Sequence, residues 1–139
     1  MNRNQQCIKG KDMGDRRTSL QRWASEQLGW SNVELTPAST DASFRSYFRI
    51  EQDGNSYVLM DAPPGREDCT PFIRVSHLLL ELGLHVPEIV AEDTGQGFLL
   101  LSDLGHRQYL AELNEHTVDR LYGDALGALA TLQSCTSFN

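Results

Sequence analysis

The stretch SFRSYFRIEQDGNSYVLM, residues 43–60, decides the fold of this chain. Apolar side chains alternate with polar and basic ones in its first half, which is the period of a half-buried strand. The two faces expected for that strand are Phe44, Phe48 and Ile50 on one side and Arg45, Tyr47 and Arg49 on the other. Asp53-Gly54-Asn55 is typical of a tight hairpin turn, and residues 57–60 form an apolar return strand. Residues 43–60 therefore predict an antiparallel hairpin.

The segment before the hairpin predicts a helix and a short strand. Apolar residues at helical spacing indicate a helix over about 19–28, and Thr18 and Gln21 have the spacing of a capping box at its start. A strand is expected over 33–35. Residues 1–16 are polar and are expected to form a disordered extension.

The segment after the hairpin predicts alternating helices and strands. Thr70 is a suitable N-cap for a helix over 71–82. The strands expected next are 88–92 and 98–102, joined by a five-residue hairpin loop, and the helices expected after them are 108–113 and 117–133. The predicted order is helix, three strands, helix, two strands and two helices.

Composition excludes several classes of protein. The 139 residues are 40% apolar and 22% charged, which is typical of a globular domain. Nineteen acidic against twelve basic residues give a net charge of −7, which argues against nucleic-acid and membrane partners. No apolar run approaches the ~20 residues that span a bilayer. Three widely spaced cysteines form no disulfide framework, so a cytoplasmic location is expected.

Small and hydroxyl residues, Ser39-Thr40-Asp41-Ala42-Ser43, lie between the first two predicted strands. Backbone N–H groups in such a turn, together with Ser and Thr oxygens, can hold a phosphate. The same residues are also common in ordinary hairpin turns, so both interpretations stay open. The acid pairs Glu67-Asp68 and Glu92-Asp93 lie in predicted turns and are expected to be solvated.

Four motifs in order resemble one family of kinases. They are the stretch Ser39 to Arg49, Val58-Leu59-Met60-Asp61-Ala62-Pro63-Pro64, Val86-Pro87, and Gly97 to Gly105. Together they resemble the aminoglycoside-phosphotransferase-like kinases, and within them the bacterial kinases of cell-wall amino sugars. The resemblance implies an α+β fold: a protein-kinase-like N-lobe with a five-stranded antiparallel sheet and a helix, followed by the first helices of a truncated C-lobe. The implied divisions are 1–16, 17–104 and 105–139.

The resemblance also implies a nucleotide-binding site, carried over residue by residue. Ser39, Thr40, Asp41, Ala42 and Ser43 match the loop over the ATP phosphates, and Ser102, Asp103 and Leu104 match the hinge beside the adenine. Val58 matches the adenine wall. Met60 stands where kinases carry a strand lysine. Two interpretations of Arg45 and Arg49 stay open: one of them supplies the positive charge instead, or each is an ordinary solvated strand residue. The implied cofactors are ATP and, in the complete enzyme, Mg²⁺.

The sequence lacks the residues that carry out phosphoryl transfer in this family. No His is followed two residues later by Asp, so the His-Gly-Asp loop is missing, and neither a catalytic nor a metal-ligating residue is assigned. The first interpretation is the ATP-binding portion of a kinase that phosphorylates the anomeric hydroxyl of N-acetylmuramate or N-acetylglucosamine in peptidoglycan recycling, inactive as this fragment. Whether the chain is itself an enzyme stays open. The alternatives are a non-catalytic nucleotide- or protein-binding module and an α+β domain whose similarity is structural only.

Truncation has a consequence for stability. The apolar stripe over 117–133 would lack its partners, and each large side chain left exposed forgoes ~1.5–3 kcal/mol of burial. The expected result is a marginal fold, a poorly docked C-terminal helix, or self-association through this helix.

Overall fold

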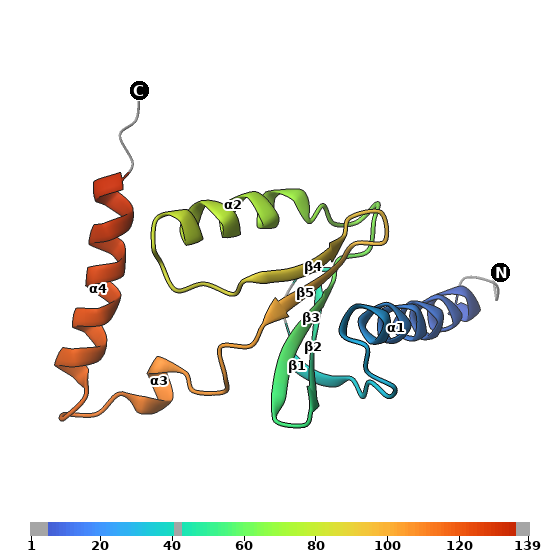
Figure 1. Cartoon of the computed structure of the whole chain (residues 1–139), viewed down its shortest axis with the longest axis horizontal. Coiled ribbons are helices and arrows are strands. Elements are labelled where there is room, and N and C mark those ends of the chain that lie inside the picture. The colour runs from blue at the N-terminus through green and yellow to red at the C-terminus, as the bar shows by residue number, and fades with distance from the viewer. Residues whose placement is uncertain (1–5, 41–42, 136–139) are drawn as a thin grey trace. The chain divides into compact units, whose positions relative to one another are not determined.

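The computed structural model describes residues 6–40 and 43–135, without the side chains of 6–13 and Thr40 (Figure 1). The elements, in chain order, are α1 (Gln6–Leu28), β1 (Thr36–Thr40), β2 (Ser46–Gln52), β3 (Asn55–Asp61), α2 (Thr70–Glu81), β4 (Ile89–Asp93), β5 (Phe98–Ser102), α3 (Tyr109–Glu112) and α4 (Val118–Cys135). This order confirms the predicted succession of elements. The chain forms two compact units, Met1–Cys69 with Ile89–Asp103, and Thr70–Glu88 with Leu104–Asn139.

The first unit is built on a five-stranded antiparallel sheet in the order β1-β2-β3-β5-β4. The sheet and its helices confirm the predicted α+β class and are consistent with a kinase-like N-lobe. The β2–β3 hairpin is as predicted: Gln52 pairs with Asn55 across Asp53 and Gly54. Both turn residues have positive φ, 52° and 79°, which is the geometry of a type I′ turn.

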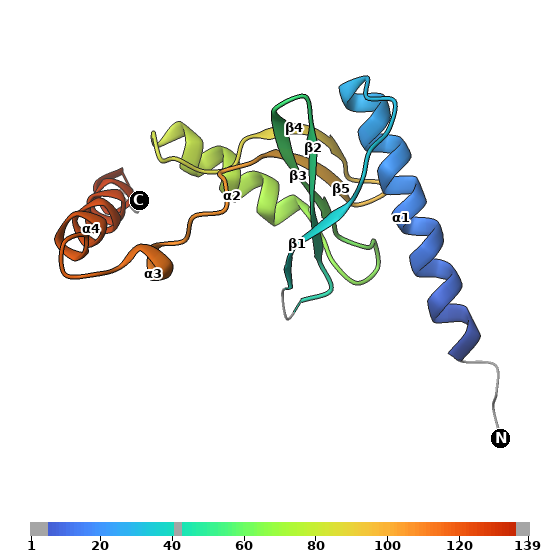
Figure 2. The ribbon, with the colours of Figure 1, turned by 90° about the horizontal axis from the view of Figure 1, so that it is seen from below.

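Helix α1 packs on one face of this sheet (Figure 2). Leu20, Trp23 and Ala24 of α1 join Leu59 and Leu100 of the sheet in one buried cluster. Side chains alternate along each strand, so the neighbours of these sheet residues point the other way. We call the two sides the α1 face and the opposite face. Residues on the α1 face include Phe48, Ile50, Leu59, Phe98 and Leu100, and those on the opposite face include Tyr47, Arg49, Val58, Met60, Leu99 and Leu101.

The beginning of the chain differs from the prediction. Helix α1 starts at Gln6, so residues 6–16 are helical rather than disordered, and 1–5 lie outside the described residues. Thr18 is therefore inside the helix, where its hydroxyl donates to the carbonyl of Gly14 at 3.0 Å. The predicted capping box is wrong, because Gln21 donates instead to the carbonyl of Val33 at 3.0 Å.

The first strand is also displaced: it was predicted over 33–35 and lies at Thr36–Thr40. Val33 and Leu35 are buried, but their carbonyls accept hydrogen bonds from Gln21 and Arg17 of α1. Backbone groups satisfied by side chains need no strand partner. The segment therefore runs beneath α1 as an irregular connection.

A tight contact closes one end of the sheet. Gly97, with φ +75°, ends the β4–β5 turn, and its carbonyl accepts a hydrogen bond from the backbone N–H of Ala62 at 2.8 Å. Asp93 orders the same turn by accepting bonds from the backbone and side chain of Gln96, at 2.9 and 2.8 Å. Asp93 is thus more than the solvated turn acid predicted.

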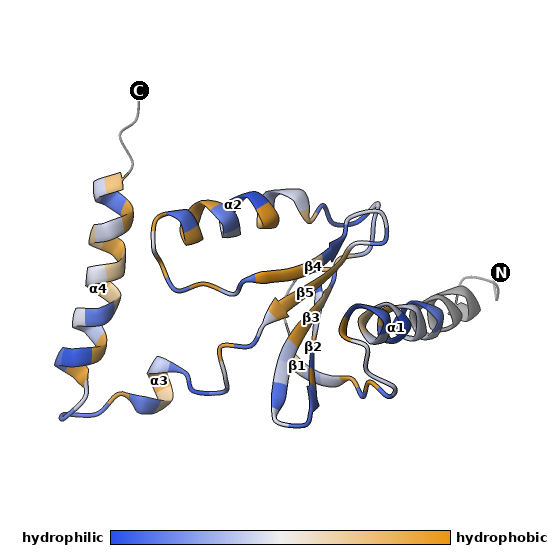
Figure 3. Cartoon of the chain, viewed as in Figure 1, coloured by the Kyte–Doolittle hydropathy of each residue, from blue (hydrophilic) through white to orange (hydrophobic). Residues whose placement is uncertain are grey.

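The second unit is helical. In α2, Ser76 is buried and its hydroxyl donates to the carbonyl of Pro87 at 3.1 Å. Helix α4 leaves large hydrophobic side chains exposed, among them Tyr122, Leu126 and Leu129. Figure 3 shows hydrophobic and hydrophilic residues interspersed along this helix. Across residues 6–40 and 43–135, no helix has the length and apolar character to cross a bilayer.

Candidate functional site

The connection between β1 and β2 is shorter than predicted. Ser39 and Thr40 belong to β1, where they pair with Tyr47 and Ser46, and a register shift precedes Ser39. Asp41 and Ala42 lie outside the described residues. Ser43 stands in the bend, and its hydroxyl accepts a hydrogen bond from the backbone N–H of Arg45 at 3.2 Å. Of the five residues assigned to a phosphate loop, two are therefore in the strand ladder.

Glu67 forms hydrogen bonds with Phe44 and Arg45, the two residues that precede Ser46. Its carboxylate accepts bonds from the backbone N–H of Phe44 and from Arg45 Nε, both at 3.3 Å. Burial lowers the pKa of Arg45, but hydrogen bonding and charge from Tyr47 and Glu67 outweigh burial, so this pKa lies above its ordinary value. The prediction that Glu67 is solvated is wrong, because its side chain is only 18% exposed and is paired.

Asp103, directly after β5, forms hydrogen bonds with side chains of β2 and β3 at the other end of the sheet. Its carboxylate accepts bonds from Arg49 Nε at 2.5 Å and Nη2 at 2.9 Å, and from the Ser56 hydroxyl at 2.6 Å. The Asp103 and Arg49 side chains are 4% and 15% exposed. The hydrogen bond to Asp103 raises the pKa of Arg49. The charge of Arg49 is thus already balanced within the fold.

The predicted hinge residues lie where the first unit ends. Ser102 is the last residue of β5, opposite Tyr57, and Asp103 closes the first unit. Leu104 opens the second unit and is half exposed. The chain therefore changes from one compact unit to the other inside the predicted hinge.

Val58 and Met60 lie side by side on the opposite face. Val58 pairs with Arg49 and Leu101, and Met60 pairs with Tyr47 and Leu99. Met60 is fully buried. The position expected for a kinase lysine therefore carries an uncharged side chain packed inside the protein.

The strand register gives the distance between the two halves of the predicted site, the β1–β2 connection and residues 102–104. Ser46, which follows the β1–β2 connection, lies in the same row of the sheet as Asp61 and Phe98. Ser102 lies four residues further along β5. At ~3.4 Å per residue, the two ends are about 14 Å apart along the strands. Such a separation suits a ligand with a base at one end and phosphates at the other.

Ser56 was not singled out from the sequence, and Glu67 was assigned no role at the site. Their partners lie 47 and 22 residues away along the chain, so no local spacing identifies them. Within the part of the chain that the structure describes, no three His, Cys, Asp or Glu side chains form a cluster that would hold a metal. Bound Mg²⁺ is therefore assigned no ligands here.

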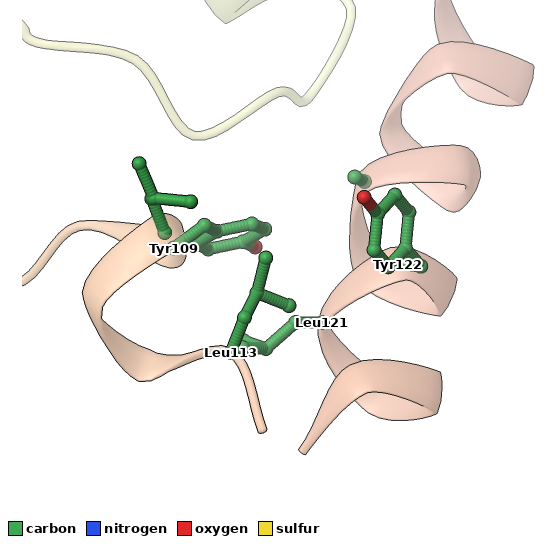
Figure 4. A pocket seen from close by; sticks show the side chains of 6 residues that line it. Tyr109, Leu113, Leu121 and Tyr122 are labelled. Carbon is green, nitrogen blue, oxygen red and sulfur yellow. The ribbon is translucent and has the colours of Figure 1, made fainter. Parts of the chain in front are cut away.

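A hollow lies between α3 and α4 (Figure 4). It measures about 270 Å³, and its walls are the aromatic and aliphatic side chains of Tyr109, Leu110, Leu113, Leu121, Tyr122 and Ala125. Leu110 is 83% exposed. The hollow and the exposed residues of α4 form one apolar surface, which we call the α3–α4 surface.

The five-stranded antiparallel sheet and its helices are consistent with a kinase-like N-lobe, although buried Met60 of β3 stands in place of the kinase lysine. Residues 34–138 match the model of the phosphotransferase enzyme family, and the chain belongs to this family. This finding confirms the resemblance on which the sequence interpretation was based.

Comparison with individual relatives gives a narrower similarity than the family match. An N-acetylmuramate/N-acetylglucosamine kinase of Pseudomonas aeruginosa is 53% identical over 108 residues, which cover 76% of this chain and 32% of the relative. Enzymes of the same name from Pseudomonas putida and Neisseria meningitidis are 47% identical over 121 residues and 35% identical over 126. These alignments cover 80% and 87% of this chain, and 36% and 37% of the relatives. The chain spans about a third of the length of these curated relatives.

Proposed function

We propose that this chain is the ATP-binding, N-terminal portion of a sugar kinase that acts in cell-wall recycling in the cytoplasm. The complete enzyme would transfer the γ-phosphate of ATP, with Mg²⁺, to the anomeric hydroxyl of N-acetylmuramate or N-acetylglucosamine. The observation that carries the proposal is the five-stranded sheet, with Val58 and Met60 on one face, in a chain 53% identical to part of a kinase of that name.

ATP would lie along the opposite face of the sheet. The adenine would lie beside Val58 and the backbone of residues 102–104, where peptide groups leave the sheet ladder. The phosphates would reach the β1–β2 connection, where Arg45, directly before β2, would supply positive charge. Because Glu67 pairs with Arg45, the positive charge there is only partly available to a phosphate.

This stretch alone would bind ATP without transferring phosphate. Phosphoryl transfer needs an aspartate that orients the acceptor hydroxyl and a set of metal ligands. The family supplies them from a His-Gly-Asp loop, and these 139 residues contain no such loop. The sugar contacts would likewise belong to the remaining two thirds of the relatives' length.

Titration of the chain with a fluorescent ATP analogue, beside a sugar-dependent ATPase assay, tests the proposal. Val58→Phe should fill the space for the adenine and weaken binding at least tenfold. Val90→Phe makes the same change at a half-exposed position of β4 and serves as the control. Failure of the unmodified chain to bind ATP would refute the proposal, and turnover by the chain alone would refute its inactivity.

The alternative is a non-catalytic module that binds a nucleotide or a protein. Buried Met60 in place of a lysine, and Arg49 balanced by Asp103, favour this alternative. Co-expression with the remaining two thirds of the P. aeruginosa relative separates the two functions. Sugar-dependent phosphorylation in the mixture supports the kinase portion, and nucleotide binding with no gain of turnover supports the module.

The remaining proposed partner is a second copy of this chain. The α3–α4 surface is apolar and exposed. Such a surface is typical of one that contacts another protein segment. In isolation, two copies would cover it by pairing.

A further inference from the structure

A pocket of about 240 Å³ opens between α1 and the beginning of β2, entirely within the first unit. Three arginines and one aspartate line it: Arg16, Arg17, Arg66 and Asp61. Their formal charges sum to +2 in a chain whose net charge is −7. A concentrated positive charge in an acidic chain attracts anions to one place.

The pocket lies on the α1 face of the sheet. Its strand residues Ser46, Phe48 and Asp61 alternate with Tyr47 and Met60, which point to the opposite face. The walls that β2 and β3 contribute therefore lie on the side of the sheet away from the face to which the adenine is assigned, and Phe44 is the lining residue that belongs to the β1–β2 connection. A ligand bound here would not compete directly with a nucleotide there.

Only one of the three arginines is neutralised. Arg16 forms an ion pair with Asp61 and donates to the carbonyl of Gln96 at 2.9 Å. Arg17 donates one bond to the carbonyl of Leu35 at 2.9 Å. Among the described residues, neither Arg17 nor Arg66 pairs with a carboxylate.

Aromatic rings hold the two unneutralised guanidinium groups in place. Arg17 Cζ lies 5.1 Å from the centre of the Phe48 ring, and Arg66 Cζ lies 5.1 Å from that of Phe44. Such stacking favours one position of each guanidinium group, more weakly for Arg66 because its Phe44 ring is 60% exposed, and leaves N–H donors at the edge of the group. Donors that are already ordered lose less entropy when they bind a ligand.

We propose that this pocket binds a small phosphomonoester. A phosphate dianion matches the charge of +2, and guanidinium groups donate paired N–H bonds to phosphate oxygens. The Ser46 hydroxyl adds a further polar group, while Phe44 and Phe48 offer apolar walls to the organic part. The volume lies below the ~300–1,000 Å³ usual for drug-sized ligands, so the organic part is small.

Calorimetric titration of the 139-residue chain with phenyl phosphate tests the proposal. We expect saturable binding that Arg66→Gln weakens at least tenfold and that Arg120→Gln, in an exposed pair on α4, leaves unchanged. Arg17→Gln is the second variant and should weaken binding similarly. Circular dichroism establishes that each variant is folded.

Three further measurements identify the site and the ligand. Phenol should not bind, and inorganic phosphate should bind more weakly than phenyl phosphate, because it lacks the contact with the rings. Saturating ATP should not displace phenyl phosphate. Displacement by ATP, binding by the Arg66→Gln and Arg17→Gln variants as tight as that of the unmodified chain, or no saturable binding would each overturn the proposal, whatever the outcome of the ATP titration.

Discussion

Among the ten glycines from Gly14 to Gly127 in the described part of the chain, Gly97 leaves the least room for a side chain. A Cβ added there would lie 1.8 Å from the carbonyl oxygen of Ala62, and the φ of +75° disfavours any L side chain. Gly97→Ala should therefore lower the free energy of unfolding by about 2–3 kcal/mol or more, measured by urea denaturation. Gly127→Ala is the control, since its added Cβ meets nothing within 4 Å and should stabilise α4 by ~0.5–1 kcal/mol.

Asp93 makes the free energy of unfolding depend on pH in the acidic range. Hydrogen bonds from the side chain and backbone of Gln96 lower the pKa of Asp93. A lowered pKa in the folded state stabilises the fold above the unfolded value near ~3.9, and this contribution is lost as the pH falls through the folded pKa. Asp93→Asn should thus be less stable than the unmodified chain at pH 7, with a difference that shrinks toward pH 3. An equal difference at both pH values would contradict the assignment.

Asp103 is the residue whose loss would leave a charge unbalanced. Asp103→Ala should cost about 3 kcal/mol in urea denaturation, because Arg49 would remain largely buried without its partner. Replacing both residues with apolar ones should recover part of this loss. Glu112→Gln is the contrast, since it breaks an exposed pair with Arg107 and should change the stability little.

At the scale of elements, local signals predicted most of the fold. Strand β5 was predicted to the residue, because Gly97 precedes its apolar run and the polar pair Ser102-Asp103 follows that run. Helix α2 was placed within one residue by its N-cap region and by Gly83. Two elements were displaced. Strand β1 lies later in the chain than predicted, because the carbonyls of Val33 and Leu35 accept hydrogen bonds from α1 residues up to 18 positions away. Helix α1 begins earlier than predicted, because residues 6–18 carry no apolar stripe that would have indicated a helix.

The same distinction holds for the candidate site. The period of two along β2 correctly predicts that Arg49 lies on the face opposite to Phe48 and Ile50. It gives no sign of Glu67 or Ser56, whose contacts join distant parts of the chain. A sequence therefore predicts which strand face carries a residue better than it predicts the partner that the residue finds there.

The α3–α4 surface should govern the association of the chain. Leu126 and Leu129 are 61% and 49% exposed on α4. Leu126→Glu with Leu129→Glu should convert self-associated chains to monomers in sedimentation velocity, because charged side chains resist burial between copies. Arg120→Gln on the same helix is the control. An unmodified chain that is monomeric at high concentration would refute the proposed self-association.

At the scale of the whole molecule, ATP should stabilise the chain by mass action. A ligand that binds only the folded state at a hundredfold excess over its Kd adds about 2.7 kcal/mol to the free energy of unfolding. We expect a rise in Tm with ATP that Val58→Phe abolishes and Val90→Phe retains. An identical rise in both variants would place the nucleotide elsewhere.

The path of the chain between its two units has a practical consequence. It crosses from one unit to the other three times, after Cys69, Glu88 and Asp103, because α2 interrupts the sheet between β3 and β4. A single protease cut would therefore always leave segments of both units on at least one fragment. Isolating the sheet for spectroscopy calls for an internal deletion of residues 70–88 with a short graft in their place, together with a stop after Asp103.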